Sequence, residues 1–79
     1  MGMAEDLQRD LKKGDHGDDV KRWQEFLKEQ GFDPGAVTKV FDLLTEQATI
    51  AFQKSRRLAG TGIVDKETRQ QISLVERSP

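Results

Sequence analysis

The first strong hydrophobic pattern in the chain runs from residue 20 to residue 30. Its apolar side chains recur every three or four residues, which is the spacing of one helical face: Val20, Trp23, Phe26 and Leu27. The predicted helix begins at Gly17 or Asp18, where acidic side chains suit the positive end of the helix dipole. It ends at Gly31, because glycine readily takes the left-handed conformation of a Schellman motif, which would fold Phe32 back onto Leu27.

A second amphipathic segment follows the turn at 33–39. Asp42 is a plausible N-cap for this helix, and its apolar face is expected to consist of Leu44, Ala48, Ala51 and Phe52. Its last turn carries the cations Lys54, Arg56 and Arg57, which suit the negative end of the dipole. The glycine-rich turn at 59–62 then ends the helix.

A third helix is predicted to begin at Asp65, after a short extended pair, with an inner face of Thr68, Ile72 and Val75. Leu7 and Leu11 lie four residues apart and predict a short leading helix that covers the others. The first two helices each carry an aromatic residue followed by glutamine, and each ends in a glycine turn. The predicted fold is therefore all-α, a small three-helix bundle with a short N-terminal lid helix and a degenerate internal repeat.

The bundle is expected to enclose one contiguous apolar core. The predicted core residues are Val20, Trp23, Leu27, Phe41, Leu44, Ala48, Phe52, Leu58, Ile63, Ile72 and Val75.

Composition narrows the class of protein. A chain of 79 residues is long enough for one domain only. It contains no cysteine, which excludes disulfides and thiol chemistry. The net charge of -1, with both signs scattered, lacks the basic footprint of nucleic-acid binding. No apolar run predicts a membrane span, and residues 1–6 lack the features of a signal peptide.

The order and spacing of these motifs resemble the helical peptidoglycan-binding domain of bacterial and phage cell-wall hydrolases. The resemblance covers about residues 11–72 and rests on glycine-x-x-glycine, apolar-glutamine, phenylalanine-glutamine and glycine-apolar-apolar-aspartate motifs. The matching residues are Leu11, Gly14, Gly17, Val20, Trp23, Gln24, Leu27, Gly31, Phe41, Thr45, Ala48, Phe52, Gln53, Leu58, Gly62, Ile63, Val64, Asp65 and Thr68.

The chain departs from the family pattern at five positions. Thr38, Lys39 and Asp42 replace an aspartate-glycine pair and a glycine around the apolar-phenylalanine pair. Trp23 stands where leucine is usual, and Thr49 where an aliphatic residue is usual. The first set falls in a loop and helix cap that could border a ligand groove, so it concerns the ligand more than the fold.

The resemblance implies a domain at residues 11–76, between an N-terminal extension at 1–10 and a tail at 77–79. Met1 and Met3 look like the remnant of an expression tag. The chain itself shows no signal peptide, so a place in the cell wall, periplasm or extracellular space requires that it be part of a larger exported protein.

The glutamines of the aromatic pairs have two interpretations. On a helix, the residue after a buried aromatic points about 100° away, to the border between core and solvent. From there Gln24 and Gln53 can form hydrogen bonds with backbone groups of the loops, which is the interpretation favoured here. The alternative is that one of these side chains bonds the amides of a wall polymer. Trp23 is expected in the core, with stacking on a sugar as the alternative.

No catalytic residue, metal site or cofactor is predicted. His16 lies near Asp15, Asp18 and Asp19, but zinc needs several nitrogen or sulfur ligands, and Phe26 stands where a calcium loop needs glutamate. No serine has the context of a nucleophile. A glycosidase needs a cleft that few domains of this size supply.

The resemblance implies a non-catalytic, monomeric module that binds the stem peptide or glycan of peptidoglycan and targets a covalently linked hydrolase. The alternative is a protein-protein interaction module, by analogy with the propeptide of matrix metalloproteases. The predicted ligand surface is a groove between the first two helices and their loop, with Arg22, Gln24, Lys39, Phe41, Asp42 and Thr45. There Thr45 and Gln24 would bond amides, Arg22 or Lys39 would pair with carboxylates, and Phe41 would supply apolar contact. In the competing interpretation Asp42 and Thr45 organise a helix start while Phe41 fills the core.

Overall fold

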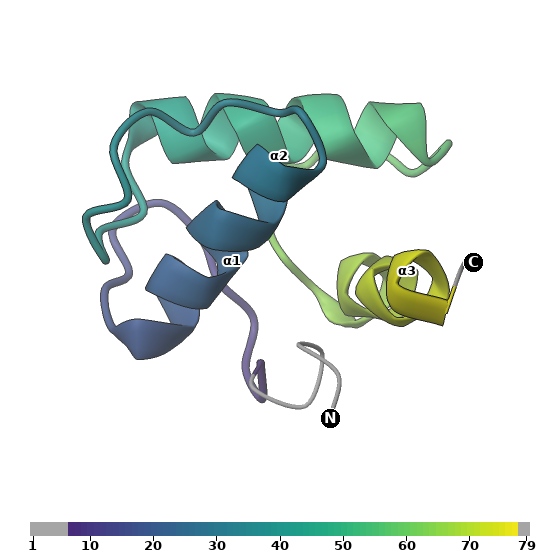
Figure 1. Cartoon of the computed structure of the whole chain (residues 1–79), viewed down its shortest axis with the longest axis horizontal. Helices are drawn as coiled ribbons and strands as arrows, with labels where there is room; N and C mark the ends of the chain where they lie inside the picture. The colour runs from purple at the N-terminus through teal and green to yellow at the C-terminus, as the bar shows by residue number, and fades with distance from the viewer. Residues whose placement is uncertain (1–6, 78–79) are drawn as a thin grey trace.

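A computed structural model of the protein describes residues 7–77, which contain three helices and no strand. The helices are α1 (Asp18–Glu29), α2 (Leu43–Ser55) and α3 (Lys66–Arg77). Figure 1 shows α1 running obliquely up to α2, with α3 to the right of α1 and below the C-terminal end of α2. The sequence prediction of an all-α fold with three helices is confirmed. Most of the predicted extension and the last two residues of the tail lie outside the described residues.

Most helix boundaries follow from capping interactions of the predicted kind. The predicted end of the second helix is wrong, because α2 ends at Ser55, before Arg56 and Arg57 and well before the glycine turn at 59–62. Asp42 accepts a hydrogen bond from the Thr45 amide at 2.9 Å, and Asp65 accepts one from the Thr68 amide at 3.0 Å. After α1, Gly31 has a φ of 87°, and the amide of Phe32 donates to the carbonyl of Leu27 at 2.9 Å. These are the bonds of an Asp N-cap and a Schellman C-cap, so both predicted signals are confirmed.

The predicted lid helix is wrong over residues 7–11. This N-terminal strap, as we call residues 7–11, is not helical, and Leu11 forms an antiparallel bridge with Val64. The two residues exchange backbone hydrogen bonds of 3.1 and 2.7 Å. A helix this short gains too few internal bonds to offset its nucleation cost, whereas the bridge satisfies the same backbone groups. The side chains of Leu7 and Leu11 still enter the core.

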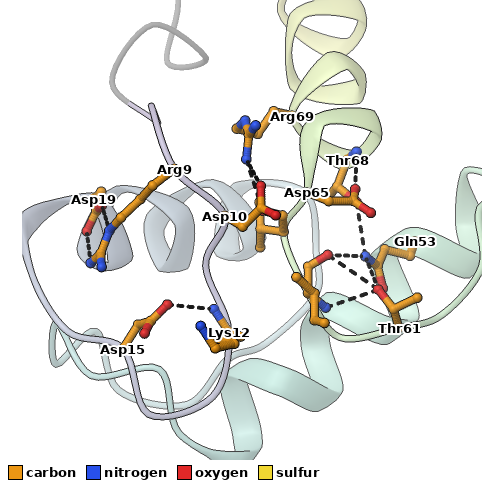
Figure 2. Close-up of polar contacts among 12 residues, drawn as sticks. Arg9, Asp10, Lys12, Asp15, Asp19, Gln53, Thr61, Asp65, Thr68 and Arg69 are labelled. Atoms are coloured by element: carbon orange, nitrogen blue, oxygen red, sulfur yellow. Dashed lines mark hydrogen bonds and ion pairs between the residues drawn. The ribbon is translucent and has the colours of Figure 1, made fainter.

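Two ion pairs fasten the strap to helices on either side of it (Figure 2). Arg9 Nε donates to Asp19 Oδ2, at the start of α1, over 2.7 Å. On the other side, Arg69 of α3 donates to Asp10 Oδ1 over 2.7 Å. Because the Arg9 guanidinium bonds the carboxylate, the pKa of Asp19 is lowered and the pKa of Arg9 is raised. The strap therefore connects α1 to α3.

The apolar core lies where the three helices and the strap meet. Its buried members are Leu7, Leu11, Val20, Trp23, Phe26, Leu27, Phe41, Ala48, Phe52, Val64 and Ile72. Phe32 and Val75 pack against this cluster while partly exposed. Leu58 is half-buried.

Three predictions about inward faces are wrong: Leu44, Ala51 and Ile63 are exposed. On α2 the inner face consists of Thr45, Ala48, Thr49 and Phe52. The Thr45 and Thr49 hydroxyls accept hydrogen bonds from Gln24 and Trp23 there, and this orientation turns Leu44 and Ala51 outward. Leu44, 53% exposed, instead lies over Gly35. Ile63 points outward because its neighbour Val64, in the extended pair, takes the inward position opposite Leu11.

Candidate functional site

A buried glutamine side chain organises the loop between α1 and α2. The Gln24 carbonyl oxygen accepts from the amides of Thr38 and Lys39, each at 3.1 Å. Its NH2 group donates to the carbonyl of Val40 at 3.0 Å and to the hydroxyl of Thr45 at 2.9 Å. One fully buried side chain thus holds three consecutive loop residues and the first turn of α2.

Gln53 makes the same arrangement in the second half of the chain. Its carbonyl oxygen accepts from the Gly62 amide at 2.9 Å, and its NH2 group donates to the Ile63 carbonyl at 2.8 Å and the Thr68 hydroxyl at 3.0 Å. Figure 2 shows this side chain between the loop and α3, close to Thr61 and Thr68. The structural role predicted for both glutamines is what the structure shows, and neither amide faces solvent.

The two halves also share their left-handed backbone positions. Lys39 (φ 72°) occupies the place of Gly62 (φ 77°) in the loop held by glutamine. Arg57 (φ 62°) occupies the place of Gly31 (φ 87°) at the helix C-terminus. There the amide of the next residue, Leu58, donates to the backbone carbonyl of Gln53 at 2.9 Å. At these two equivalent positions, each half therefore has one glycine and one cation.

Trp23 and Thr49, two departures from the family pattern, contact each other directly. The indole Nε1 donates to the Thr49 hydroxyl at 2.9 Å, and this hydroxyl donates to the Thr45 carbonyl at 2.7 Å. Both side chains are fully buried. The predicted core position of Trp23 is confirmed. A buried indole needs an acceptor, which explains why a hydroxyl replaces an aliphatic side chain at position 49.

We expect a double-mutant cycle to show coupling between Trp23 and Thr49. Thr49→Val alone should lower the free energy of unfolding by about 1–3 kcal/mol, because the indole donor stays buried without a partner. In a Trp23→Leu background the same change should cost less by about 1 kcal/mol or more. Urea denaturation of the four proteins measures this difference. Additive losses would contradict the pairing.

The predicted ligand residues divide into buried and exposed groups. Gln24, Phe41 and Thr45 are at most 1% exposed, and Asp42 is half-buried with its carboxylate on the Thr45 amide. Arg22 and Lys39 are exposed. The buried side chains thus support the loop from below, and the two cations stand at the surface.

Sequence reasoning missed an exposed apolar surface beside Lys39. Val40, Leu43 and Leu44 are 46%, 50% and 53% exposed. Together with Lys39 they form what we call the loop surface (Lys39, Val40, Leu43 and Leu44). The signal that could have found Leu43 is the helical period, which places it nearly opposite the face of Thr45, Ala48 and Phe52. Two shallow hollows flank this region.

The first hollow, of about 350 Å³, is lined by Asp18, Lys21, Arg22 and Glu25 at the start of α1. The second, of about 500 Å³, lies at the end of α1 and is lined by Lys28, Gly31, Asp33, Gly35 and Ala36.

An exposed ion pair joins the loop surface to α1. Lys39 Nζ lies 3.0 Å from Asp18 Oδ1. The hydrogen bond and charge of Lys39, together with the nearby charges of Lys21 and Arg22, hold the pKa of Asp18 below its ordinary value. Within residues 7–77, no three histidine, aspartate or glutamate side chains lie close enough together to hold a metal ion. No helix in this part of the chain has the length and apolarity to cross a membrane.

The family model described as "Putative peptidoglycan binding domain" matches residues 16–72. The chain belongs to this family. It is 34% identical over 67 residues to the carboxy-terminal processing protease CtpB of Bacillus subtilis (strain 168), a match that covers 85% of this chain and 14% of the protease. The chain thus spans a small part of this relative.

Solved structures show the same fold. The SleB N-terminal domain has a TM-score of 0.83 and 30% identity over 90% of this chain and 97% of that domain. A Burkholderia AP3 phage endolysin has a TM-score of 0.80 and 29% identity over 91% of this chain and 27% of its own. A peptidoglycan-binding protein from Clostridioides difficile, crystallised with glutamine hydroxamate, has a TM-score of 0.77 and 28% identity over 81% of this chain and 40% of its own.

These matches define a peptidoglycan-binding module of the kind found in cell-wall hydrolases, proteases and endolysins. The chain corresponds to the binding domain of its homologues, whose catalytic activity lies in other domains. Peptidoglycan binding associates the module with the cell wall.

Proposed function

We propose that this module acts as a monomer and keeps a covalently linked cell-wall hydrolase close to its substrate. The protease and the endolysin are each much longer than the matched region, which leaves room for other domains in those proteins. A tethered weak binder raises the local concentration of substrate without new chemistry. The whole protein would then act outside the cytoplasmic membrane, where the polymer lies.

The proposed contact is the stem peptide, on the loop surface with Arg22 beside it. The observation that carries this proposal is the Gln24 network, which holds an exposed apolar and cationic loop segment in one conformation. A rigid surface loses little conformational entropy when a ligand binds. Lys39 and Arg22 would pair with carboxylates, and Val40 and Leu43 would contact alkyl groups of the peptide.

The remaining predicted residues would act through the loop they support. Gln24, Asp42 and Thr45 have their polar side-chain atoms engaged inside the protein. Phe41 anchors the segment in the core, with 1% of its surface exposed. In this proposal they position the loop surface, while the ligand contacts Arg22, Lys39 and the apolar side chains.

We expect the protein to sediment with purified sacculi and to stay in solution when the sacculi have been digested with mutanolysin. The double variant Val40→Ser, Leu43→Ser should bind sacculi roughly tenfold more weakly, because each change removes apolar contact area. Leu74→Ser is the matched control, since Leu74 is 51% exposed on α3, away from the loop surface.

Two results would contradict this proposal. Equal retention of the double variant and Leu74→Ser would remove the loop surface as the contact. No retention of the unmodified protein on any sacculus would favour the protein-protein module.

A further inference from the structure

Two exposed cations hold a backbone conformation that glycine adopts without strain. Among residues 7–77, Lys39 and Arg57 are the non-glycine residues with positive φ. The left-handed region is strained for residues other than glycine, and the equivalent positions in the other half of the chain are Gly62 and Gly31. A side chain kept at such a position calls for an explanation other than the backbone itself.

The helix dipole explains Arg57 but not Lys39. Arg57 lies just beyond the C-terminus of α2, where a cation is favourable. Lys39 lies shortly before the N-terminus of α2, and the His16–Val40 bridge places its segment beside the N-terminus of α1. Both helix ends carry partial positive charge, so a cation here gains nothing from the helices and raises the local attraction for an anion.

The backbone fixes where the Lys39 side chain emerges. Its amide donates to the Gln24 carbonyl oxygen at 3.1 Å, and its carbonyl accepts from the Gly17 amide at 2.9 Å. The other half cannot present a side chain in this way, because Gly62 is buried and a Cβ there would lie 2.9 Å from Glu46 Cγ. Of the two glutamine-held loops described here, the first therefore presents a charged side chain at this position and the second does not.

The present partner of Lys39 is easily replaced. The side chains of Lys39 and Asp18 are 54% and 86% exposed, and an ion pair this exposed contributes little to stability because water screens it. Asp18 lies in the first turn of α1, where a carboxylate is favourable without Lys39. A ligand carboxylate could thus take over the ammonium group at little cost.

We infer that Lys39 is a specificity-determining residue, which makes this module prefer stem peptides with a free carboxylate over the same peptides with that carboxylate amidated. The inference rests on the proposed function, since it takes the loop surface as the peptide contact. A carboxylate accepts a charge-assisted hydrogen bond from the ammonium group. A carboxamide is neutral, and an NH2 group replaces one of the two carboxylate oxygens. This NH2 group is a donor, so the ammonium group, which also only donates, cannot bond it.

The test uses two synthetic stem peptides that differ only at their second residue, D-glutamate with a free α-carboxylate or D-isoglutamine. Calorimetric titration should show that the unmodified protein binds the free acid roughly 3- to 10-fold more tightly. This preference should shrink as salt is added, because exposed charges are screened. Lys39→Gly should bind both peptides with the same affinity. This affinity should equal that of the unmodified protein for the amidated peptide.

Arg57→Gly is the matched control. It removes the same charge and relieves the same left-handed conformation at the other end of α2, so it should keep the full preference. Glycine suits the backbone at both positions, and a thermal melt of each variant checks that it folds.

Three results would overturn the inference. These are equal binding of both peptides by the unmodified protein, a preference that survives in Lys39→Gly, and binding to sacculi but to neither peptide. The last would leave the wall-binding proposal standing. Failure to bind both peptides and sacculi would overturn the inference and the proposed function together.

Discussion

Phe52→Ala should lower the free energy of unfolding by about 3–5 kcal/mol, the usual cost of removing a large aromatic ring from a core. Phe52 is 1% exposed, and its ring packs edge-to-face against Trp23, Phe26 and Phe32 with centroids 5.4 to 5.8 Å apart. These contacts join α2 to α1 and to the turn that follows α1. For a domain of this size the loss is comparable to the whole stability.

Leu44→Ala is the control for this prediction. It changes the same helix at a residue that is 53% exposed, so urea denaturation should show a loss below about 1 kcal/mol. The two variants also distinguish the orientation of α2 in the structure from the one predicted by the sequence pattern, which placed both residues on the inner face. Similar losses for the two variants would contradict the orientation of α2 described above.

The second large effect is expected at Gln53. Gln53→Leu should remove about 3 kcal/mol or more, because it leaves buried partners of this side chain without hydrogen bonds, and each such group costs about 1–3 kcal/mol. The Gly62 amide and the Thr68 hydroxyl bond Gln53 in the protein interior. Native-state hydrogen exchange should also show that the Gly62 amide loses its protection.

Gln70→Leu is the matched control, because Gln70 is exposed on α3. It should change the free energy of unfolding by less than about 0.5 kcal/mol. If both variants unfolded at the same urea concentration, the Gln53 network would not stabilise the fold.

The sequence predicted the starts of α2 and α3 and the end of α1 well because the interactions that set them are local. It missed the end of α2, where Arg57 instead of a glycine takes the positive φ. An aspartate N-cap bonds the amide three residues later, as Asp42 and Asp65 do. A glycine that follows a helix closes it through bonds within the same turn, as at Gly31. Such contacts depend on residue types a few positions apart, so they can be predicted from a single sequence.

The structural role of the glutamines was also predictable, though their partners were not. An aromatic residue on the inner face places the next residue at the border of the core, where a glutamine meets loop backbone. Which loop groups it meets depends on how the loop returns over the helix. The six predicted ligand residues did not include Val40, whose exposure follows from that return path, or Leu43 and Leu44, whose exposure follows from the face that α2 turns to the core.

The sequence by itself determined the three helices, most of their ends and the family to which the chain belongs, because these follow from periodicity, short-range hydrogen bonds and motif order. Tertiary structure alone decided that the strap pairs with Val64 instead of forming a helix, and that Trp23 bonds Thr49 from 26 residues away. It also decided that Lys39 stands exposed where the other half of the chain buries a glycine. The reason is that long-range contacts depend on which faces and backbone groups the packed helices bring together, and a linear pattern does not contain that information.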